Sequence, residues 1–164
     1  FVHEKHHGDL DLVRLAGWWG NNPETRFDMH GQEHFIPRQS ADGWKVSNPA
    51  LFSIVPLKSS LEMFHEIGFG VLRERSMRLT AYLEKGIQAI EGVESITPED
   101  PERRGCQISV RVQGDAATLE KELIRKGIVP DARDPDVLRF APTPMYSSFS
   151  DIARAIRQLE KLVR

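Results

Sequence analysis

The sequence is poor in cysteine, since Cys106 is the only one among 164 residues. One thiol cannot close a disulfide within the chain, which excludes the class of disulfide-stapled secreted domains and fits a protein of the reducing cytoplasm. Cys106 lies just before an apolar, strand-like run, where a cysteine usually behaves as a small buried apolar residue. We therefore expect no catalytic role for this thiol.

The sequence also lacks an excess of one charge and long apolar runs. Its formal net charge is −2, which provides neither the basic field that attracts nucleic acid nor a polybasic membrane patch. No apolar run approaches the roughly 20 residues that a membrane-spanning helix needs. With 40% hydrophobic and 28% charged residues, the composition is that of an ordinary globular domain. We expect neither a nucleic-acid nor a membrane partner.

Familiar catalytic motifs are missing as well: the sequence has no G-x-S-x-G, H-E-x-x-H, P-loop or G-x-G-x-x-G pattern. His3, His6 and His7 lie close together, but no further ligand on a fixed element is evident, so no metal is expected. Phe1-Val2 resembles the end of a strand already under way, and the first residues are neither an initiator methionine nor a signal peptide. We expect the chain to be a piece of a longer protein.

The first two thirds of the chain divide into a loop-rich and a helical part. Residues 1–50 are dense in glycine, proline, asparagine, histidine and aromatics. Their helix potential is limited to Asp9–Leu15, and Trp44-Lys45-Val46 is strand-like. Two helices should follow, one with Pro56 in its first turn and Gly68 as its stop, the other over residues 70–91 and closed by Gly92. Their apolar stripes are Leu57, Leu61 and Phe64, then Leu72, Leu79, Leu83, Ile87 and Ile90.

The last third, after a turn-rich stretch from Pro98 to Gly105, alternates short strands and helices. Their order predicts helices on one face of a small sheet, an α+β fold. A stand-alone regulatory or binding module of this fold is one alternative, although it leaves the aromatic first third unexplained. The expected elements are a strand at Gln107–Val112, a helix capped by Asp115 and stopped by Gly127, strands at Ile128–Pro130 and Val137–Ala141 joined by Arg-Asp-Pro-Asp, and a helix with a Ser148/Asp151 capping box and the stripe Ile152, Ile156, Leu159 and Val163.

Two candidate binding elements lie in the first 50 residues. Gly17-Trp18-Trp19-Gly20 places two indoles on an irregular backbone, and an indole offers one N–H and a flat face to a phosphate or an aromatic cofactor. In Ser47-Asn48-Pro49 the proline restricts Asn48 to extended geometry, which fixes the direction of its amide. Taken alone, the first is more simply a packed loop anchor and the second an ordinary turn.

A third candidate is Arg139, which interrupts an apolar strand. Alternation points Leu138 and Phe140 to one side and Arg139 to the other. The rigid guanidinium fork of an arginine near a strand end can hold a carboxylate through two hydrogen bonds. Taken alone, a surface salt bridge is the simpler explanation.

Together these segments resemble the kynureninase family nearly from end to end. Two positions depart from the family pattern, because Asn21 stands where the family usually has histidine and Ala50 where it usually has a second proline. The matching segments are Phe1-Val2-His3-Glu4-Lys5-His6, Leu15-Ala16-Gly17-Trp18-Trp19-Gly20, Thr25-Arg26-Phe27 with Met29, Trp44-Lys45-Val46-Ser47-Asn48-Pro49, Ser60-Leu61-Glu62-Met63-Phe64, Leu79-Thr80-Ala81-Tyr82-Leu83-Glu84, Ile96-Thr97-Pro98, Arg104-Gly105-Cys106-Gln107-Ile108-Ser109 and Arg139-Phe140-Ala141-Pro142-Thr143-Pro144-Met145-Tyr146.

The resemblance implies part of an α/β fold-type-I pyridoxal-phosphate enzyme that acts as a homodimer. Residues 1–50 would be the end of the large cofactor-binding domain, residues 51–95 would be bridging helices, and residues 96–164 would form the small C-terminal α+β domain. The implied reaction is the hydrolysis of kynurenine or 3-hydroxykynurenine to alanine and the corresponding anthranilate.

The resemblance also implies roles for individual residues. Trp18 and Asn48 match positions that contact the cofactor, Arg139 matches the arginine that holds the substrate α-carboxylate, and Trp19, Ser47 and Asn48 match positions beside the substrate. The lysine that carries the cofactor lies upstream of this chain in the family. We therefore expect no catalytic residue within the chain and no activity from it alone.

Overall fold

The computed structural model describes residues 1–31 and 33–163, which divide into two units, one from Phe1 to Leu61 and the other from Glu62 onward. Within the described residues, none of the helices combines the length and apolar character that crossing a membrane requires. The first unit consists of loops and three short 3-10 helices up to residue 50, followed by the first part of helix α1 (Leu51–Ile67). The 3-10 helices are η1 (Glu4–His6), η2 (Arg26–Gly31) and η3 (Ala41–Trp44).

Three local predictions for the first unit are wrong. Phe1-Val2 is not in a strand, and Asp9–Leu15 forms bends rather than a helix. Trp44 ends η3 instead of beginning a strand, because Ser40 caps this turn by accepting a hydrogen bond from Asp42 N at 3.1 Å. A side-chain cap of this kind stabilises a helical turn whatever the β propensity of the residues that follow it.

Asn21 is the buried polar residue that ties two loops of the first unit together. Its side chain is 3% exposed, and Oδ1 accepts hydrogen bonds from Asn22 N at 2.9 Å and Ile36 N at 3.3 Å. Asn22 N also donates to Ile36 O at 2.8 Å, and Asn21 forms a β-bridge with Pro37. The residue that departs from the family pattern therefore has a structural role in this chain.

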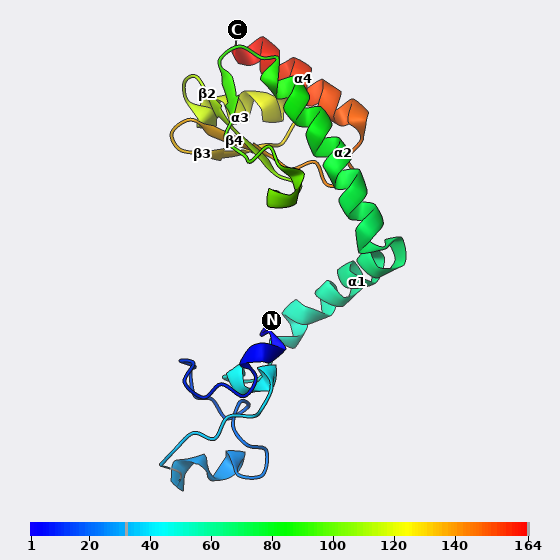
Figure 1. The fold of residues 1–164 in the computed structure, drawn as a ribbon. Coiled ribbons are helices and arrows are strands. Elements are labelled where there is room, and N and C mark those ends of the chain that lie inside the picture. The colour runs from blue at the N-terminus through cyan, green and yellow to red at the C-terminus, as the bar shows by residue number, and fades with distance from the viewer. Residues whose placement is uncertain (32, 164) are drawn as a thin grey trace. The chain divides into compact units, whose positions relative to one another are not determined.

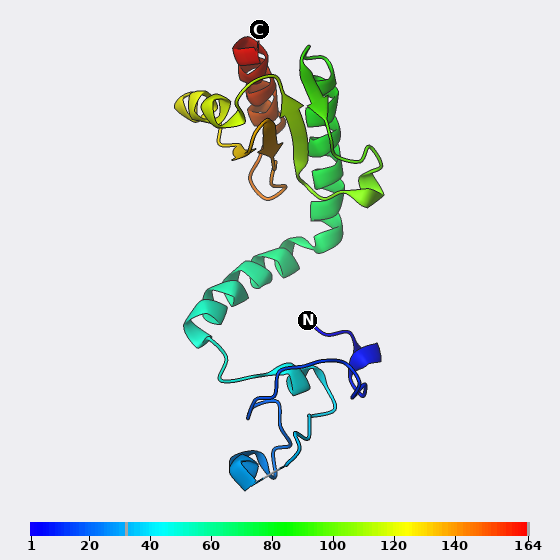
Figure 2. The same ribbon diagram turned by 90° about the vertical axis from the view of Figure 1, so that its left-hand side faces the viewer.

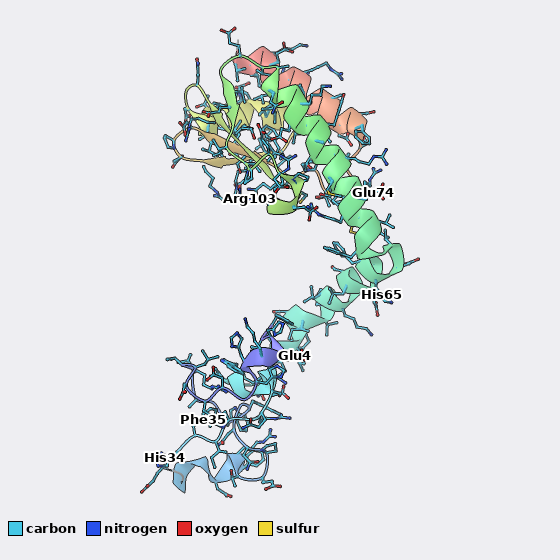
Figure 3. All side chains as sticks on the ribbon, viewed as in Figure 1. Glu4, His34, Phe35, His65, Glu74 and Arg103 are labelled. Atoms are coloured by element: carbon cyan, nitrogen blue, oxygen red, sulfur yellow. The ribbon has the colours of Figure 1, made fainter. Side chains whose placement is uncertain are left out.

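Helix α1 (Leu51–Ile67) starts earlier than expected. Pro56 lies inside it rather than in its first turn, while Gly68, with a φ of 88°, follows its end as predicted. All of α1 except Ser60 is exposed, and Figure 3 shows the His65 side chain projecting from it. The apolar stripe Leu57, Leu61 and Phe64 thus forms but is not buried within this chain.

Helix α2 (Phe69–Gln88) carries the core of the second unit. The predicted apolar residues Leu72, Leu79, Leu83, Ile87 and Ile90 are all buried, but the helix ends at Gln88 rather than at residue 91, so Ile90 lies in the turn that follows it. Figure 1 shows α2 running alongside α4 (Phe149–Val163), which it contacts directly.

A four-stranded antiparallel sheet completes the second unit, in the order β1-β2-β4-β3. Figure 2 shows α2, α3 and α4 grouped on one side of this sheet, as an α+β arrangement requires. One predicted strand is misplaced, because Ile128–Pro130 is irregular and the strand follows it, and β1 was not predicted. The elements are β1 (Val93–Ser95), η4 (Pro101–Arg103), β2 (Ile108–Val112), α3 (Ala116–Arg125), β3 (Asp131–Arg133) and β4 (Val137–Phe140).

The core lies between the sheet and the three helices. Alternate residues of β2 are buried there, as the sequence predicted, and the expected caps are present at Asp115 and at the Ser148/Asp151 box. The opposite face of the sheet carries polar side chains, Arg139 among them. The buried apolar cluster consists of Leu79, Leu83, Ile87, Ile90, Ile108, Val110, Val112, Ala116, Leu123, Ile128, Leu138, Phe140, Ile152 and Leu159.

Candidate functional site

Two glycines let the segment Gly17-Trp18-Trp19-Gly20, the tryptophan loop, lie directly against the backbone of residues 43–46. A Cβ on Gly17 would fall 2.2 Å from Val46 O, and one on Gly20 would fall 2.8 Å from Gly43 O. Neither position has room for a side chain, because the obstructing atoms belong to the backbone. The glycines that flank the two tryptophans therefore set the approach of the loop that carries Ser47 and Asn48.

Ion pairs of Asp42 stabilise the turn that precedes Asn48. Asp42 forms ion pairs with Arg38 at 3.1 Å and with Lys45 at 2.5 Å. The hydrogen bond from Lys45 lowers the pKa of the Asp42 carboxyl below its usual value, so this carboxylate stays ionised near neutral pH. These contacts fix the turn from which residues 46–48 extend.

Trp19 of the tryptophan loop and Asn48 are in direct contact. Trp19 Nε1 donates a hydrogen bond to Asn48 Oδ1. Because an indole N–H can only donate, the bond assigns the oxygen of the Asn48 amide and leaves its NH2 group as the side that can donate to a ligand. Trp19 is therefore a partner of Asn48, and its N–H is not available to a substrate in this arrangement.

Trp18 has a different environment. Its ring packs against Trp19 at 5.8 Å and Phe27 at 5.9 Å between centroids, and it is half-buried. No described residue accepts a hydrogen bond from its indole N–H. Ser47, which directly precedes Asn48, is exposed. Indole N–H, amide NH2 and hydroxyl groups are donors that suit a phosphate or a ring substituent, so these residues fit the expected cofactor.

Sequence reasoning missed Arg26 as a member of this site. Its guanidinium lies 4.8 Å from the centroid of the Trp19 ring and 5.9 Å from that of Phe27. A cation over an indole face is a favourable arrangement and adds a positive charge beside the tryptophan pair. The signal was present in Thr25-Arg26-Phe27, which follows the tryptophan loop, but no spacing rule relates it to Trp19.

Arg139 belongs to the second unit. Leu138 and Phe140 are buried under the helices, so the expected alternation along β4 is confirmed. The Arg139 side chain, 31% exposed, donates from Nε to Asp131 Oδ2 at 2.6 Å and from Nη2 to the same oxygen. The salt bridge, which was the simpler alternative to a binding role for Arg139, is therefore present, but it occupies only one edge of the guanidinium.

Asp131 was also missed. It lies opposite Arg139 in the β3–β4 register, eight residues away along the chain. The turn Arg-Asp-Pro-Asp, which was predicted, would have found it, because a hairpin centred on residue 135 pairs residues 131 and 139. Placing the strand at Ile128–Pro130 hid this relationship.

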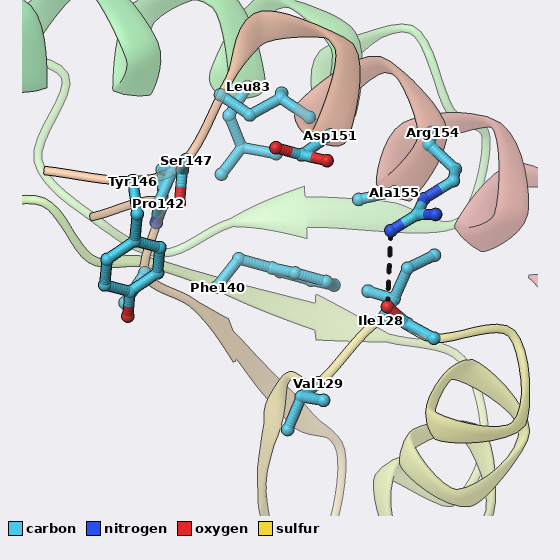
Figure 4. A pocket seen from close by; sticks show the side chains of 13 residues that line it. Leu83, Ile128, Val129, Phe140, Pro142, Tyr146, Ser147, Asp151, Arg154 and Ala155 are labelled. Carbon is cyan, nitrogen blue, oxygen red and sulfur yellow. Dashed lines mark hydrogen bonds between the residues drawn. The ribbon is translucent and has the colours of Figure 1, made fainter. Parts of the chain in front are cut away.

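A pocket of about 360 Å³ lies on the helix side of β4 (Figure 4). Phe140, Ile128, Asp151 and Arg154 are among the residues that line it, and Arg154 donates to Gly127 O at 3.5 Å. None of the predicted site residues lines this pocket. Within the described residues, no group of three or more histidine, cysteine, aspartate or glutamate side chains is arranged to hold a metal ion.

Comparison with known proteins gives the family. A family model described as the kynureninase C-terminal domain matches residues 72–159. The kynureninase of Xanthomonas oryzae pv. oryzae is 44% identical over 165 residues, which cover 98% of this chain and 38% of the relative. The kynureninase of Salinispora tropica is 45% identical over 168 residues, with coverages of 99% and 39%. The chain thus spans less than half the length of the curated relatives that it matches.

Solved structures give the fold. The complex of the cystine C-S lyase C-DES with cysteine persulfide has a TM-score of 0.74 at 15% identity, over 98% of this chain and 41% of that one. The apo cysteine desulfurase from Thermococcus onnurineus has a TM-score of 0.74 at 13% identity, over 99% and 42%. These likenesses show a shared fold, that of fold-type-I pyridoxal-phosphate enzymes, which confirms the expected fold class. The family model matches more than half of the residues of this chain. The chain therefore belongs to the kynureninase family and contains that family's C-terminal domain.

Proposed function

We propose that this chain is the C-terminal part of a kynureninase, which hydrolyses kynurenine or 3-hydroxykynurenine to alanine and the corresponding anthranilate. The observation that carries this proposal is the 44% identity to a kynureninase along 98% of the chain. The whole enzyme would be a homodimer, with residues 1–50 in its large domain, 51–95 as bridging helices and 96–164 as its small domain.

The cofactor of this activity would be pyridoxal phosphate, which supplies an electron sink for bond cleavage beside the substrate's α-carbon. Within this chain, Trp18 would donate its indole N–H to the phosphate, and Asn48 would donate from its amide NH2. The free donor on Trp18 and the fixed amide of Asn48 support these roles. Ser47 and Asn48 would lie beside the aromatic ring of the substrate, and Trp19 would also take part in substrate binding.

Arg139 would hold the substrate α-carboxylate. A guanidinium stays charged near neutral pH and offers two parallel donors that match the two oxygens of a carboxylate. Leu138 and Phe140 account for the burial of β4, so Arg139 is not needed for the core. Its free edge, away from Asp131, is available to a second anion.

Arg139→Lys tests this role in the full-length enzyme that contains the chain. Lysine keeps the charge but loses the fork, so kcat/KM should fall by about 10- to 150-fold, the equivalent of one charge-assisted contact of ~1.5–3 kcal/mol, with thermal stability nearly unchanged. Arg111→Lys is the matched control, since Arg111 lies on the neighbouring strand and pairs with Glu94 and Asp136. Normal kinetics together with a lowered melting temperature in Arg139→Lys would instead assign Arg139 to structure.

The chain alone should not bind the cofactor covalently, because the lysine that carries it would lie in the part of the protein that precedes these residues. After incubation with pyridoxal phosphate and reduction with borohydride, the 164-residue chain should carry no stoichiometric label on any one lysine. The alternative function, a non-catalytic α+β module, predicts in addition that the full-length protein has no activity towards kynurenine.

A further inference from the structure

We propose that Asp131 is a positioning residue that orients Arg139 for a carboxylate ligand. This inference rests on the proposed function, in which Arg139 binds the substrate α-carboxylate. It assigns to the neighbouring strand a residue that would act on the substrate only through the arginine.

Asp131 and Arg139 lie side by side on the same face of the sheet. They are direct partners in the antiparallel β3–β4 ladder, so their side chains leave the sheet in the same direction. Arg139 uses Nε and Nη2 on the single oxygen Oδ2 of Asp131. These two nitrogens form the side edge of the guanidinium. The other edge, formed by Nη1 and the second proton of Nη2, remains for a ligand.

A second arginine, Arg133, shares the Asp131 carboxylate with Arg139. Asp131 Oδ2 is also approached by Arg133 Nη2 at 3.1 Å. One carboxylate is thus shared between two guanidinium groups, and the cluster Arg133–Asp131–Arg139 retains one excess positive charge. Asp131 therefore screens the repulsion between the arginines without cancelling the attraction that the cluster exerts on an anion.

The Asp131 contact also restricts the conformations of the Arg139 side chain before a ligand binds. An unpaired arginine loses much of its rotamer freedom when it binds a ligand, and that loss weakens binding. Arg139 is already fixed by two hydrogen bonds to a partner on an adjacent strand. Loss of Asp131 should therefore weaken carboxylate binding by about 10-fold, even though Asp131 is itself an anion near the site.

The experiment compares kynurenine with its methyl ester, which lacks the negative charge, in the full-length enzyme. In Asp131→Ala, KM for kynurenine should rise roughly 10-fold, while KM for the ester and kcat for both change less than about 3-fold. Arg139→Lys should show the same selectivity, and adding Asp131→Ala to it should have little further effect, because Asp131 acts through Arg139. Asp136→Asn is the matched control, since Asp136 pairs with Arg111 at 3.3 Å.

The other outcomes separate this inference from the proposed function. If Arg139→Lys loses kynurenine selectively but Asp131→Ala affects kynurenine and ester alike, the positioning role is overturned and the carboxylate role of Arg139 stands. Tighter kynurenine binding in Asp131→Ala would show that Asp131 competes for Arg139, which also overturns it. If Arg139→Lys discriminates neither ligand, the carboxylate role itself fails. Should Asp131→Ala not fold, Asp131→Asn keeps the shape and one acceptor, and the kynurenine-to-ester ratio is read from that variant.

Discussion

Glu84 of α2 and Arg104 of the loop before β2 form an ion pair in which both side chains are nearly fully buried. Their exposures are 9% and 5%, and Arg104 Nη1 also donates to Pro98 O at 3.1 Å. Within the described structure, Glu84 Oε1 and Arg104 Nε are buried without a hydrogen-bond partner. The pair ties the turn-rich segment Pro98–Gly105 to the core helix, at the cost of removing two charges from water.

Removing one partner of this pair should be strongly destabilising. Glu84→Ala leaves the Arg104 charge buried and uncompensated, so the free energy of unfolding should fall by ~3–5 kcal/mol. The double variant Glu84→Leu/Arg104→Met should recover most of this loss, because it removes both desolvated charges. Urea unfolding of the single and double variants measures both effects.

The surface pair Glu122–Arg125 provides the control. The Arg125 side chain is 69% exposed and that of Glu122 is 39% exposed, far more than those of the buried pair, so Glu122→Ala should change stability by less than ~1 kcal/mol. If Glu84→Ala were no more damaging than Glu122→Ala, the buried pair would not be holding the Pro98–Gly105 segment in place.

Gly17→Ala should separate the tryptophan loop from the loop of Asn48. The added Cβ would lie 2.2 Å from Val46 O and 2.3 Å from Val46 Cα, so one backbone segment must move. Trp19 would then lose its bond to Asn48. All three tryptophans of the chain lie in this unit, so their emission should shift to the red as the loop opens.

Gly8→Ala is the matched control in the same unit. Its Cβ would meet only Gln39 Oε1 at 3.6 Å, an ordinary contact with a flexible side chain. Emission should stay at the wild-type wavelength in this variant. An unshifted spectrum in Gly17→Ala as well would show that the two loops are not packed as described.

Trp18→Phe should weaken cofactor binding in the full-length enzyme. The change removes an N–H donor but keeps a ring that can pack against Trp19 and Phe27. If the donor reaches the cofactor phosphate, affinity should fall by ~1.5–3 kcal/mol, as measured by equilibrium titration of the apoenzyme with pyridoxal phosphate. Trp44→Phe is the control, since the Trp44 ring stacks on Arg14 at 3.9 Å. Equal affinities in both variants would leave Trp18 with a packing role.

Local patterns predicted the second unit well. The alternation of Ile108, Val110 and Val112 located β2, and the side-chain caps located α3 and α4, because each signal depends on residues within one turn or strand. Strand β3 was misplaced for the opposite reason. Asp131-Ala132-Arg133 has weak strand propensity, and only its pairing with β4 makes it a strand.

The first unit was less predictable because its structure depends on contacts between distant segments. Trp19 reaches Asn48 only because Gly17 and Gly20 lie against residues 43–46. The sequence identified Trp18, Trp19 and Asn48 as candidates, but not their pairing, nor the position of Arg26 over the Trp19 ring. The cofactor, substrate and lysine roles came from family resemblance, and no local pattern in the chain contains them.

The capping aspartates of α3 and α4 should make the second unit sensitive to acid. Hydrogen bonds from the Thr118 hydroxyl and Thr118 N hold the pKa of Asp115 below its usual value, and those from the Ser148 hydroxyl and Ser148 N do the same for Asp151. Each carboxylate is thus more acidic in the folded than in the unfolded chain, where the pKa of aspartate is ~3.9. Its contribution to stability is fully present above that pH and is lost as the pH falls through the lower folded pKa.

Replacing these two aspartates should therefore flatten the acid side of the stability curve. Asp115→Asn/Asp151→Asn should lower the melting temperature of the second unit at pH 7, because the charged acceptors at two helix N-termini are lost. The difference from wild type should shrink as the pH is lowered below ~4, where aspartates of the unfolded chain take up protons, and it should vanish once the pH is below the lower pKa values of the folded carboxylates. Glu91→Gln is the control, since Glu91 is exposed and outside both caps, and its variant should follow the wild-type curve. Thermal melts followed by far-ultraviolet circular dichroism from pH 7 down to pH 2 measure the comparison. A constant offset between variant and wild type across this range would mean that the aspartates contribute through shape and not through their charge.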